Sequence, residues 1–241
     1  LKRQFQYSPV YHLHTLCSNR LRDEEKTYRT NFSQLGTIHN HLLDSLYVKK
    51  KITNHKYKDT KWKIVTLVRD PIQRNASAFF QTLNLHGKNL GFTDKIKHGK
   101  DPNLISEMTD YFISKFDHTR PFNWFDVELK KYFGIDVLAA GFPREKGYGI
   151  FHGETADALV IRLEDLNYCA PEAFYEFTGI KNFHLENQQV SGKKYYSKVY
   201  KEFLNQIKFS ESFLNQIYDT RFTETFYTQA EIDRFRAKWA K

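Results

Sequence analysis

The clearest pattern of hydrophobic positions in the chain spans residues 62–83. Residues 62–68 (WKIVTLV) are nearly continuous in apolar and β-branched character, which predicts a strand covered on both faces of a parallel sheet. Asp70 can cap the free N–H groups of a following helix, and Pro71 suits the first position of that helix. Residues 71–83 continue with apolar side chains at helical spacing. This stretch therefore predicts a strand, a tight turn and a helix.

A second hydrophobic pattern, with a period of two, covers residues 9–16 (PVYHLHTL). It predicts a strand with Val10, His12 and His14 on one face. Two further strands are predicted at 136–140 (DVLAA) and 158–163 (ALVIRL).

The remaining periodic segments predict helices. Helical spacing is found in the second half of 22–45 and at 104–116, 122–132, 172–178, 198–207, 211–218 and 229–239, with Gly134 as a helix stop. Segments rich in polar residues, Gly or Lys predict loops or turns at 49–61, 86–103 and 141–154. Strands and helices alternate in the first part of the chain, which predicts a βαβ architecture followed by a helical C-terminal part.

Composition and length predict one folded domain. The 241 residues are 40% hydrophobic and 27% charged, as in globular proteins, so disorder is excluded as the main state. The longest apolar run is 158–161, far below the roughly 18 to 20 residues that cross a bilayer, so no membrane span is predicted. The two cysteines lie in no metal-binding spacing, which favours a reducing, cytoplasmic location and no metal site.

The charge balance indicates an anionic partner. Lys and Arg number 37 against 28 Asp and Glu, a net charge of +9. A nucleotide, a polyanionic glycan or nucleic acid would each fit this charge. Nucleic acid is disfavoured because no RNP, zinc-finger or clear helix-turn-helix pattern is present. A P-loop phosphoryl-transfer enzyme is disfavoured because GxxxxGK[ST] is absent.

Candidate binding chemistry lies where the strand at 62–68 ends. Ligands of α/β sheets bind beyond the carboxyl ends of the strands, and Arg69 stands at that end. Arg74 and Ser77 are three residues apart and share a helix face, so the three side chains could form a phosphate pocket. The alternative is a structural ion pair between Arg69 and Asp70, with Arg74 and Ser77 facing water.

Residues 65–79 (VTLVRDPIQRNASAF) resemble the 3′-phosphate-binding motif V-R-D-P-x-x-R-x-x-S-x-F of sulfotransferases. The resemblance implies that Arg69 and Ser77 hold the 3′-phosphate of the sulfate donor PAPS. Further stretches are similar to bacterial capsular polysaccharide synthesis proteins with a sulfotransferase-like fold: 11–14, 124–129, 134–137, 162–166 and 235–239. This likeness implies a P-loop-like, three-layer α/β/α fold with a central parallel sheet.

The chain departs from the sulfotransferase pattern at one motif. The family holds the 5′-phosphosulfate in a loop resembling P-K-x-G-[ST]-[ST], and no glycine here lies in such a sequence. The chain also begins at Leu1, without Met. We therefore expect residues 1–241 to form a single sulfotransferase-like domain whose first strand and 5′-phosphosulfate loop lie upstream. The alternative is a paralogue that has lost catalysis.

The reaction would need a base for the acceptor hydroxyl, and His suits this role near neutral pH. His14, near the end of its predicted strand, is the first candidate and His12 the second. His39 and His41 are weaker candidates, because they lie on a helix whose orientation the sequence does not fix. Each histidine could instead be a core residue with no catalytic role.

A basic segment near the C-terminal part, SGKKYY at 191–196, lies where sulfotransferases place a loop that closes over the nucleotide. Lys193 and Lys194 could neutralise the ligand, although a solvated turn fits the sequence equally well. The resemblance thus predicts a PAPS-dependent sulfotransferase acting on a hydroxyl acceptor, a carbohydrate, with PAP as product and no metal. The alternative is a non-catalytic polyanion-binding protein that uses the lysines of 49–61 and 95–100.

Overall fold

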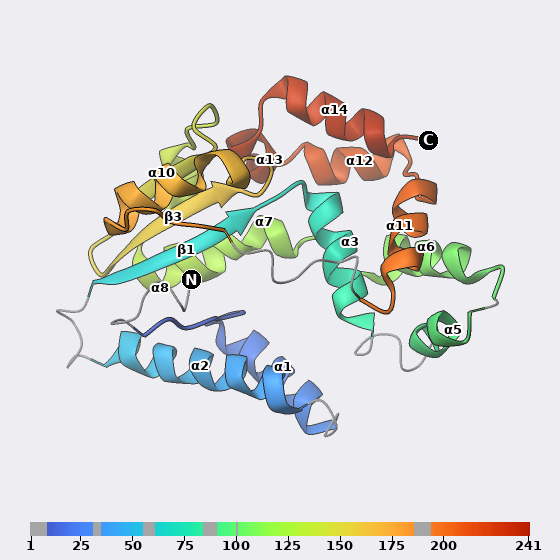
Figure 1. Cartoon of the computed structure of the whole chain (residues 1–241), viewed down its shortest axis with the longest axis horizontal. Coiled ribbons are helices and arrows are strands. Elements are labelled where there is room, and N and C mark those ends of the chain that lie inside the picture. The colour runs from blue at the N-terminus through green and yellow to red at the C-terminus, as the bar shows by residue number, and fades with distance from the viewer. Residues whose placement is uncertain (1–8, 31–34, 55–60, 84–90, 100, 186–193) are drawn as a thin grey trace.

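The computed structural model describes residues 9–30, 35–54, 61–83, 91–99, 101–185 and 194–241 (Figure 1). The fold is mixed α/β and 60% helical. The strands are β1 (Trp62–Val68), β2 (Tyr148–His152) and β3 (Ala156–Arg162). The helices are α1 (Ser18–Thr30), α2 (Leu35–Thr53), α3 (Pro71–Gln81), α5 (Phe92–His98), α6 (Leu104–Lys115), α7 (Arg120–Trp124), the π-helical η3 (Phe125–Lys130), α8 (Lys131–Phe133), α9 (Val137–Ala140), α10 (Leu166–Thr178), α11 (Ser197–Gln206), α12 (Glu211–Tyr218), α13 (Arg221–Phe226) and α14 (Gln229–Trp239).

The three strands form one small sheet in the order β1-β3-β2. β1 pairs parallel to β3, with Val65 opposite Leu159, and β2 pairs antiparallel to β3, with Ile150 opposite the same Leu159. The parallel pair is joined through a long helical connection, whereas β2 and β3 are consecutive. The described sheet is therefore mixed and small, which differs from the central parallel sheet expected from the sequence.

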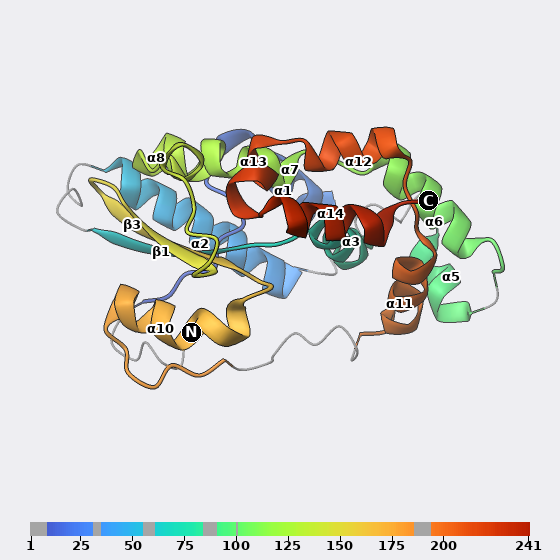
Figure 2. The ribbon, with the colours of Figure 1, turned by 90° about the horizontal axis from the view of Figure 1, so that it is seen from above.

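Helices cover both faces of this sheet (Figure 2). Ala158 and Val160 of β3 belong to the large core that includes Val48 of α2, while Leu159 and Ile161 belong to a second core beneath α10. Alternate residues of β3 are thus buried on opposite faces. This two-sided burial explains the continuous apolar run in its sequence.

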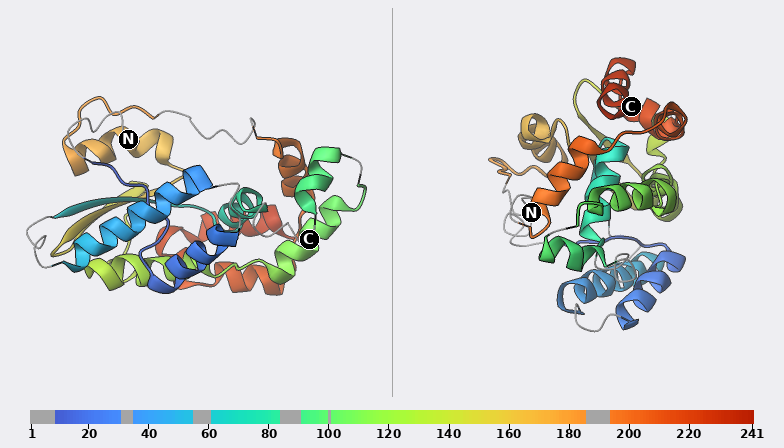
Figure 3. Two further views of the ribbon diagram at one scale, coloured as in Figure 1. Left: turned by 90° about the horizontal axis from the view of Figure 1, so that it is seen from below. Right: turned by 90° about the vertical axis from the view of Figure 1, so that its right-hand side faces the viewer.

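Aromatic packing fixes α3 at the end of β1. Phe79 and Phe80 of α3 are almost fully buried and contact Phe203 of α11, with ring centroids 6.0 and 5.2 Å away. Phe79 also lies 5.5 Å from Phe112 of α6. Helices α1 and α2 lie on one side of α3, and α12 and α14 lie on the opposite side (Figure 3).

The prediction of a strand at 9–16 is wrong, because residues 9–17 are irregular and pair with no described strand. Side chains satisfy their polar groups instead. The carboxylate of Glu128 on η3 accepts hydrogen bonds from the Thr15 hydroxyl and from the Leu16 N–H, the second at 2.7 Å. The His12 carbonyl oxygen lies 3.0 Å from Nδ1 of His41. The prediction failed because alternating residue types do not reveal that these contacts, and not pairing with a strand, hold the segment in place.

The strand predicted at 136–140 is also wrong. Asp136 caps the short helix α9, because its Oδ1 accepts a hydrogen bond from Ala139 N at 3.0 Å. The strand β2 lies instead within the segment 141–154, which the sequence predicted as turn-rich. Helix α13 was not predicted.

Most other predicted elements are confirmed, with shifted ends. β1, α3, α6, β3 and the helices α10, α11, α12 and α14 occupy the predicted segments, and Gly134, with φ of 68°, ends α8. Two predicted loops are partly helical: 86–103 contains α5, and α2 extends into 49–61. The segment 22–45 falls on two helices, α1 and α2. Within the described residues, no helix is both long and apolar enough to cross a membrane.

Candidate functional site

The turn between β1 and α3 is built around Asp70, which is 1% exposed. Its Oδ1 caps α3 by accepting a hydrogen bond from Ile72 N at 3.1 Å, as predicted, and accepts a second from the Tyr218 hydroxyl at 2.7 Å. Its Oδ2 accepts from Trp239 Nε1 at 3.0 Å. Burial and the neighbouring Asp70 charge raise the pKa of Tyr218, which therefore stays a donor. Asp70 is thus fully occupied in joining α3 to α12 and α14.

Arg69 is consequently not paired with Asp70, and the structural ion pair considered from the sequence is wrong. The half-buried Arg69 makes no hydrogen bond or ion pair with any residue in the described part of the chain. Its charge acts on Tyr200 of α11, whose pKa is raised by burial and lowered in part by Arg69. Glu164, after β3, accepts a hydrogen bond from Asp70 N at 2.9 Å and so joins the ends of the parallel strands.

One face of α3 is open to solvent. Ile72, Ala76, Phe79 and Phe80 are buried, whereas Gln73, Arg74, Ser77, Ala78 and Gln81 are partly or fully exposed. Arg74 and Ser77 therefore share the exposed face, as their spacing predicted. The Ser77 hydroxyl accepts a long hydrogen bond from Gln81 Nε2, at 3.4 Å, which leaves its own proton available to a ligand. The convergence of Arg69 and Ser77 on one phosphate stays a prediction.

The two candidate bases lie in a group of three imidazoles. The His14 ring centroid is 5.7 Å from that of His12 and 4.7 Å from that of His41 on α2, and His12 and His41 are 4.4 Å apart. Burial, followed by the charges of His41, His12 and Arg120, lowers the pKa of His14 from 6.5 to about 4. His14 is therefore neutral at pH 7 and can accept a hydrogen bond or a proton. The side chain of His39 lies outside the described residues.

Arg74 belongs to the same side of the molecule as these histidines. Burial, followed by the charge of Arg120, lowers the pKa of Arg74 to about 10, and Arg20 adds to this effect. Asp117 acts in the opposite direction. Sequence analysis did not identify Arg20 and Arg120 as site residues, because they lie on α1 and α7 and come near Arg74 only in the folded chain.

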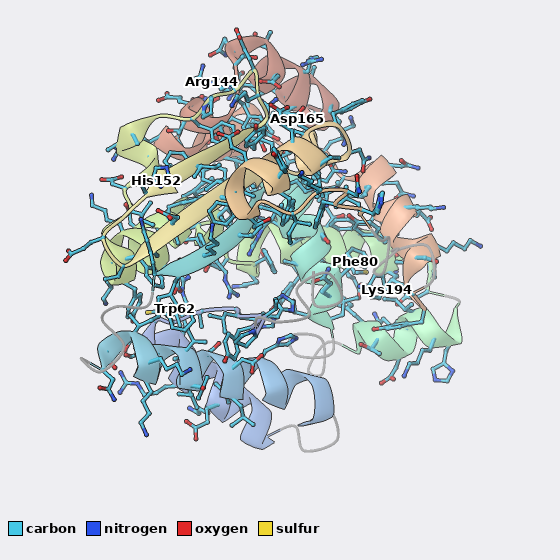
Figure 4. All side chains as sticks on the ribbon, turned by 60° about the vertical axis from the view of Figure 1, so that its left-hand side comes forward. Trp62, Phe80, Arg144, His152, Asp165 and Lys194 are labelled. Carbon is cyan, nitrogen blue, oxygen red and sulfur yellow. The ribbon has the colours of Figure 1, made fainter. Side chains whose placement is uncertain are left out.

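Lys194, which precedes α11, lies beside a different part of α3 from the histidines. Its Nζ is 5.7 Å from the Tyr196 ring centroid, and the Tyr196 ring is 5.5 Å from that of Phe80. Figure 4 shows Lys194 beside Phe80. Phe80 is about 13 Å along the helix axis from Pro71, at 1.5 Å per residue, so Lys194 lies near the C-terminal half of α3. Lys193 lies outside the described residues.

A cavity of about 490 Å³ is found elsewhere, beside β2 and the end of α10. Lys63 is one of its lining residues, and it lies about 20 Å along β1 from Arg69, at about 3.3 Å per residue. Its lining carries two lysines, Lys63 and Lys146, and two carboxylates, Asp157 and Glu176, so its charges are balanced. This balance gives no indication of an anionic ligand. Across the described residues, no group of three or more His, Cys, Asp or Glu side chains is arranged to hold a metal ion.

Comparison with known proteins gives one match. No curated protein and no solved structure matches the chain. The family NKWYS matches residues 93–228, which extend from α5 to the residue before α14 and exceed half of the chain. The match includes Arg120 and Lys194 and lies C-terminal to the segment with Arg69 and Ser77. The chain therefore belongs to this family, which is described as "Putative capsular polysaccharide synthesis protein".

Proposed function

We propose that this protein is a PAPS-dependent sulfotransferase that transfers a sulfuryl group to a hydroxyl of a carbohydrate during polysaccharide synthesis. Family membership supports the polysaccharide-related role. The sulfate donor is inferred from two observations. Residues 65–79 resemble the 3′-phosphate-binding motif, and Arg69 has no ion-pair partner among the described residues.

The observation that carries the proposal is the guanidinium of Arg69 at the carboxyl end of β1, which has no ion-pair partner among the residues that the structure describes. Its sequence neighbour Asp70 is committed to Ile72, Tyr218 and Trp239. A guanidinium presents paired N–H donors that match two oxygens of a phosphate, which an ammonium group cannot do as well. Arg69 can therefore accept a phosphate without first breaking an ion pair with any described residue.

The position of Ser77 on α3 fits a role beside that phosphate. At about 100° per residue, Ser77 lies about 60° around the helix from Phe80 on one side and about 60° from Arg74 on the other. Phe80 contacts Tyr200, the residue on which the Arg69 charge acts, with ring centroids 5.0 Å apart. Ser77 thus lies between the side of α3 associated with Arg69 and the side associated with the histidines.

PAPS would supply the activated sulfuryl group. Arg69 and Ser77 would bind its 3′-phosphate, and Lys194 would add positive charge near the nucleotide. His14 would accept the proton of the acceptor hydroxyl, because its imidazole is neutral at pH 7. Its lowered pKa makes it a weaker base than a free histidine, and a bound anion nearby would raise that pKa and strengthen the base. His12 is the second candidate for this role.

Calorimetric titration of the complete protein with PAP tests the donor assignment. Arg69→Ala is expected to weaken PAP binding about tenfold to a hundredfold, because a hydrogen-bonded charge pair contributes about 1.5–3 kcal/mol. Arg69→Lys should bind PAP more tightly than Arg69→Ala but more weakly than wild type, because lysine keeps the charge and lacks the paired N–H donors of the guanidinium. The exposed Arg234→Ala on α14 removes the same charge and should leave binding unchanged. Equal affinity of wild type and Arg69→Ala, or equal affinity for PAP and ATP, would refute the assignment.

The polyanion-binding alternative finds less support in the described lysines. Lys95 forms ion pairs with Asp101 at 2.8 Å and with Glu107 at 2.5 Å. Lys49 donates a hydrogen bond to the Ser18 hydroxyl on the neighbouring helix α1. Lys95 is thus matched by carboxylates, and Lys49 helps to join α1 to α2.

A further inference from the structure

Six basic side chains from five segments gather on one side of α3, and we call them the basic cluster. They are His12 and His14 from the irregular segment 9–17, Arg20 from α1, His41 from α2, Arg74 from α3 and Arg120 from α7. The imidazoles are joined by ring contacts, Arg120 acts on both His14 and Arg74, and Arg20 acts on Arg74. All six keep part of their surface open to solvent, so a ligand can reach them.

Among the described residues, two carboxylates interact with the basic cluster: Asp117, on which the charges of Arg20 and Arg120 act, and Glu128. Both also accept hydrogen bonds from other donors. Oδ1 of Asp117 accepts hydrogen bonds from Thr119, at 2.9 Å from its N and 2.7 Å from its hydroxyl. Glu128 accepts from Thr15 and from Leu16 N, and it also forms an ion pair with Arg20, whose Nη1 lies 3.7 Å from Oε1. That Nη1 is buried and has no hydrogen-bond partner among the described residues. In the described part of the chain, three guanidinium groups therefore share two carboxylates whose oxygens also accept other hydrogen bonds.

Arg74 is held in place without being neutralised. Its Nη1 donates to Asn75 Oδ1 at 2.9 Å, and Asn75 Nδ2 lies 3.3 Å from both Nδ1 and the carbonyl oxygen of His118. His118 Nε2 in turn lies 2.7 Å from the Phe112 carbonyl oxygen, which assigns the proton to Nε2 and leaves Nδ1 as an acceptor. Burial lowers the pKa of His118, so this support is uncharged. A neutral chain of hydrogen bonds therefore orients a guanidinium whose charge is left for another partner.

Bringing like charges together is unfavourable, and a bound oxyanion would reduce the repulsion between them. Guanidinium groups bind carboxylate, sulfate and phosphate through paired hydrogen bonds, and a neutral imidazole that gains a proton adds a further charged donor. We propose that the basic cluster binds an oxyanion carried by the acceptor, so that the acceptor is an acidic glycan bearing carboxylate or sulfate groups. The assignment to the acceptor rests on the proposed function.

The basic cluster is separate from the proposed nucleotide site. Arg69 acts on Tyr200 of α11, whereas the charges that act on Arg74 come from α1, α7 and the segment before α7. Ser77 lies between the two on α3. An acidic sugar held by the cluster would place a neighbouring hydroxyl near His14, the candidate base.

The test follows the His14 imidazole by NMR in the complete protein, with His14→Gln used to assign its signal. Sodium sulfate and sodium glucuronate are titrated separately at constant ionic strength maintained with sodium chloride. Either anion is expected to raise the pKa of His14 from about 4 by about one unit or more, a tenfold gain in proton affinity, because an adjacent negative charge stabilises the imidazolium. The tighter of the two anions identifies whether the acceptor group is a sulfate or a carboxylate.

Two arginines on α1 provide a matched pair of variants. Arg20→Gln should weaken the binding of sulfate or glucuronate about tenfold, and Arg20→Lys should weaken it less. Arg22 is exposed, two residues away, and bonded to Asn19. Arg22→Gln changes the net charge equally and should alter binding less than about twofold, because solvent screens a charge at an exposed site.

The outcomes separate this proposal from the proposed function. Identical His14 titrations in sulfate, glucuronate and chloride would overturn the anion site, as would equal weakening by Arg20→Gln and Arg22→Gln. If PAP displaces glucuronate and Arg69→Ala abolishes glucuronate binding, the cluster belongs to the nucleotide site and the proposal fails. If glucuronate binds as expected while PAP does not bind, the proposed function fails and the anion site stands.

Discussion

Arg162 and Arg74 show two ways of holding a guanidinium in this protein. Arg162, which is 6% exposed, donates to Asp165, to both oxygens of Glu231 at 3.0 and 3.1 Å, and to the Phe226 carbonyl oxygen at 3.2 Å. Arg74 donates only to a neutral amide among the described residues. The first arginine is matched by carboxylates of the fold, and the second is not. The difference suggests that matched charge serves structure and unmatched charge serves a ligand.

The same contrast extends to the surroundings of each arginine. Around Arg162, Glu231 completes a capping box with Thr228 at the start of α14. Asp70 joins α3 to Tyr218 of α12 and to Trp239 of the same helix α14. On the opposite side of α3, the three arginines of the basic cluster share two carboxylates, Asp117 and Glu128, among the described residues. The C-terminal helices are thus secured by closed polar networks, while the N-terminal side keeps an open one.

The largest expected effect comes from breaking the matched region. Arg162→Met leaves Asp165 and Glu231 without their cation and should lower the free energy of unfolding by about 3–5 kcal/mol, as when one partner of a buried ion pair is removed. Urea unfolding followed by circular dichroism measures the change. Arg234→Met, on the exposed face of α14, should alter stability by less than about 0.5 kcal/mol. A loss below about 1 kcal/mol in Arg162→Met would contradict the structural role.

An intermediate effect is expected at the Asp70 network. Tyr218→Phe removes one hydrogen bond to a buried carboxylate and should reduce the free energy of unfolding by about 2 kcal/mol. Tyr175, which is 53% exposed, gives the control, since Tyr175→Phe removes a solvated hydroxyl. Comparable losses in the two variants would show that the Asp70 network does not hold α12 against α3.

The smallest effect concerns pH and the basic cluster. Because the pKa of His14 is lower in the folded protein than its ordinary 6.5, protons bind more readily to the unfolded chain as the pH falls below that value. Stability should therefore decline between pH 6.5 and 4, by about 1 kcal/mol at pH 5 after allowance for solvent screening of a partly exposed side chain. His14→Gln should flatten this decline in urea unfolding measured at pH 7 and pH 5. An unchanged decline in that variant would place its cause elsewhere.

The matched region responds in a different pH window. Although burial opposes its ionisation, hydrogen bonds from Thr228 and the charge of Arg162 lower the pKa of Glu231. A carboxylate with a lowered pKa stabilises the fold above its ordinary value of 4.5 and loses that contribution as the pH falls further. Glu231 therefore contributes to the loss of stability below pH 4.5, whereas His14 contributes to the loss between pH 6.5 and 4. Comparing His14→Gln with wild type separates the contribution of His14 from that of His118, whose pKa burial also lowers.

Local signals explain which elements the sequence predicted well. The strand, cap and helix around Asp70 depend on residues within about twenty positions of one another, and all three are confirmed. The strand predicted at 9–16 failed because a period of two reports only alternating residue types, while Glu128, over a hundred residues away, supplies the contacts of that segment. β2 was missed because turn residues surround its short apolar run.

The sequence by itself determined the β1–α3 unit, the exposure of Arg74 and Ser77 on one helix face, and the net positive charge, because each depends on residue type and short-range spacing. Only the tertiary structure decided which charges are matched. Asp70 binds Tyr218 and Trp239, so that Arg69 has no carboxylate partner among the described residues, and the charges of Arg20 and Arg120 act on Arg74. Electrostatic interactions depend on distance in space, and segments far apart in the chain set those distances only when the chain folds.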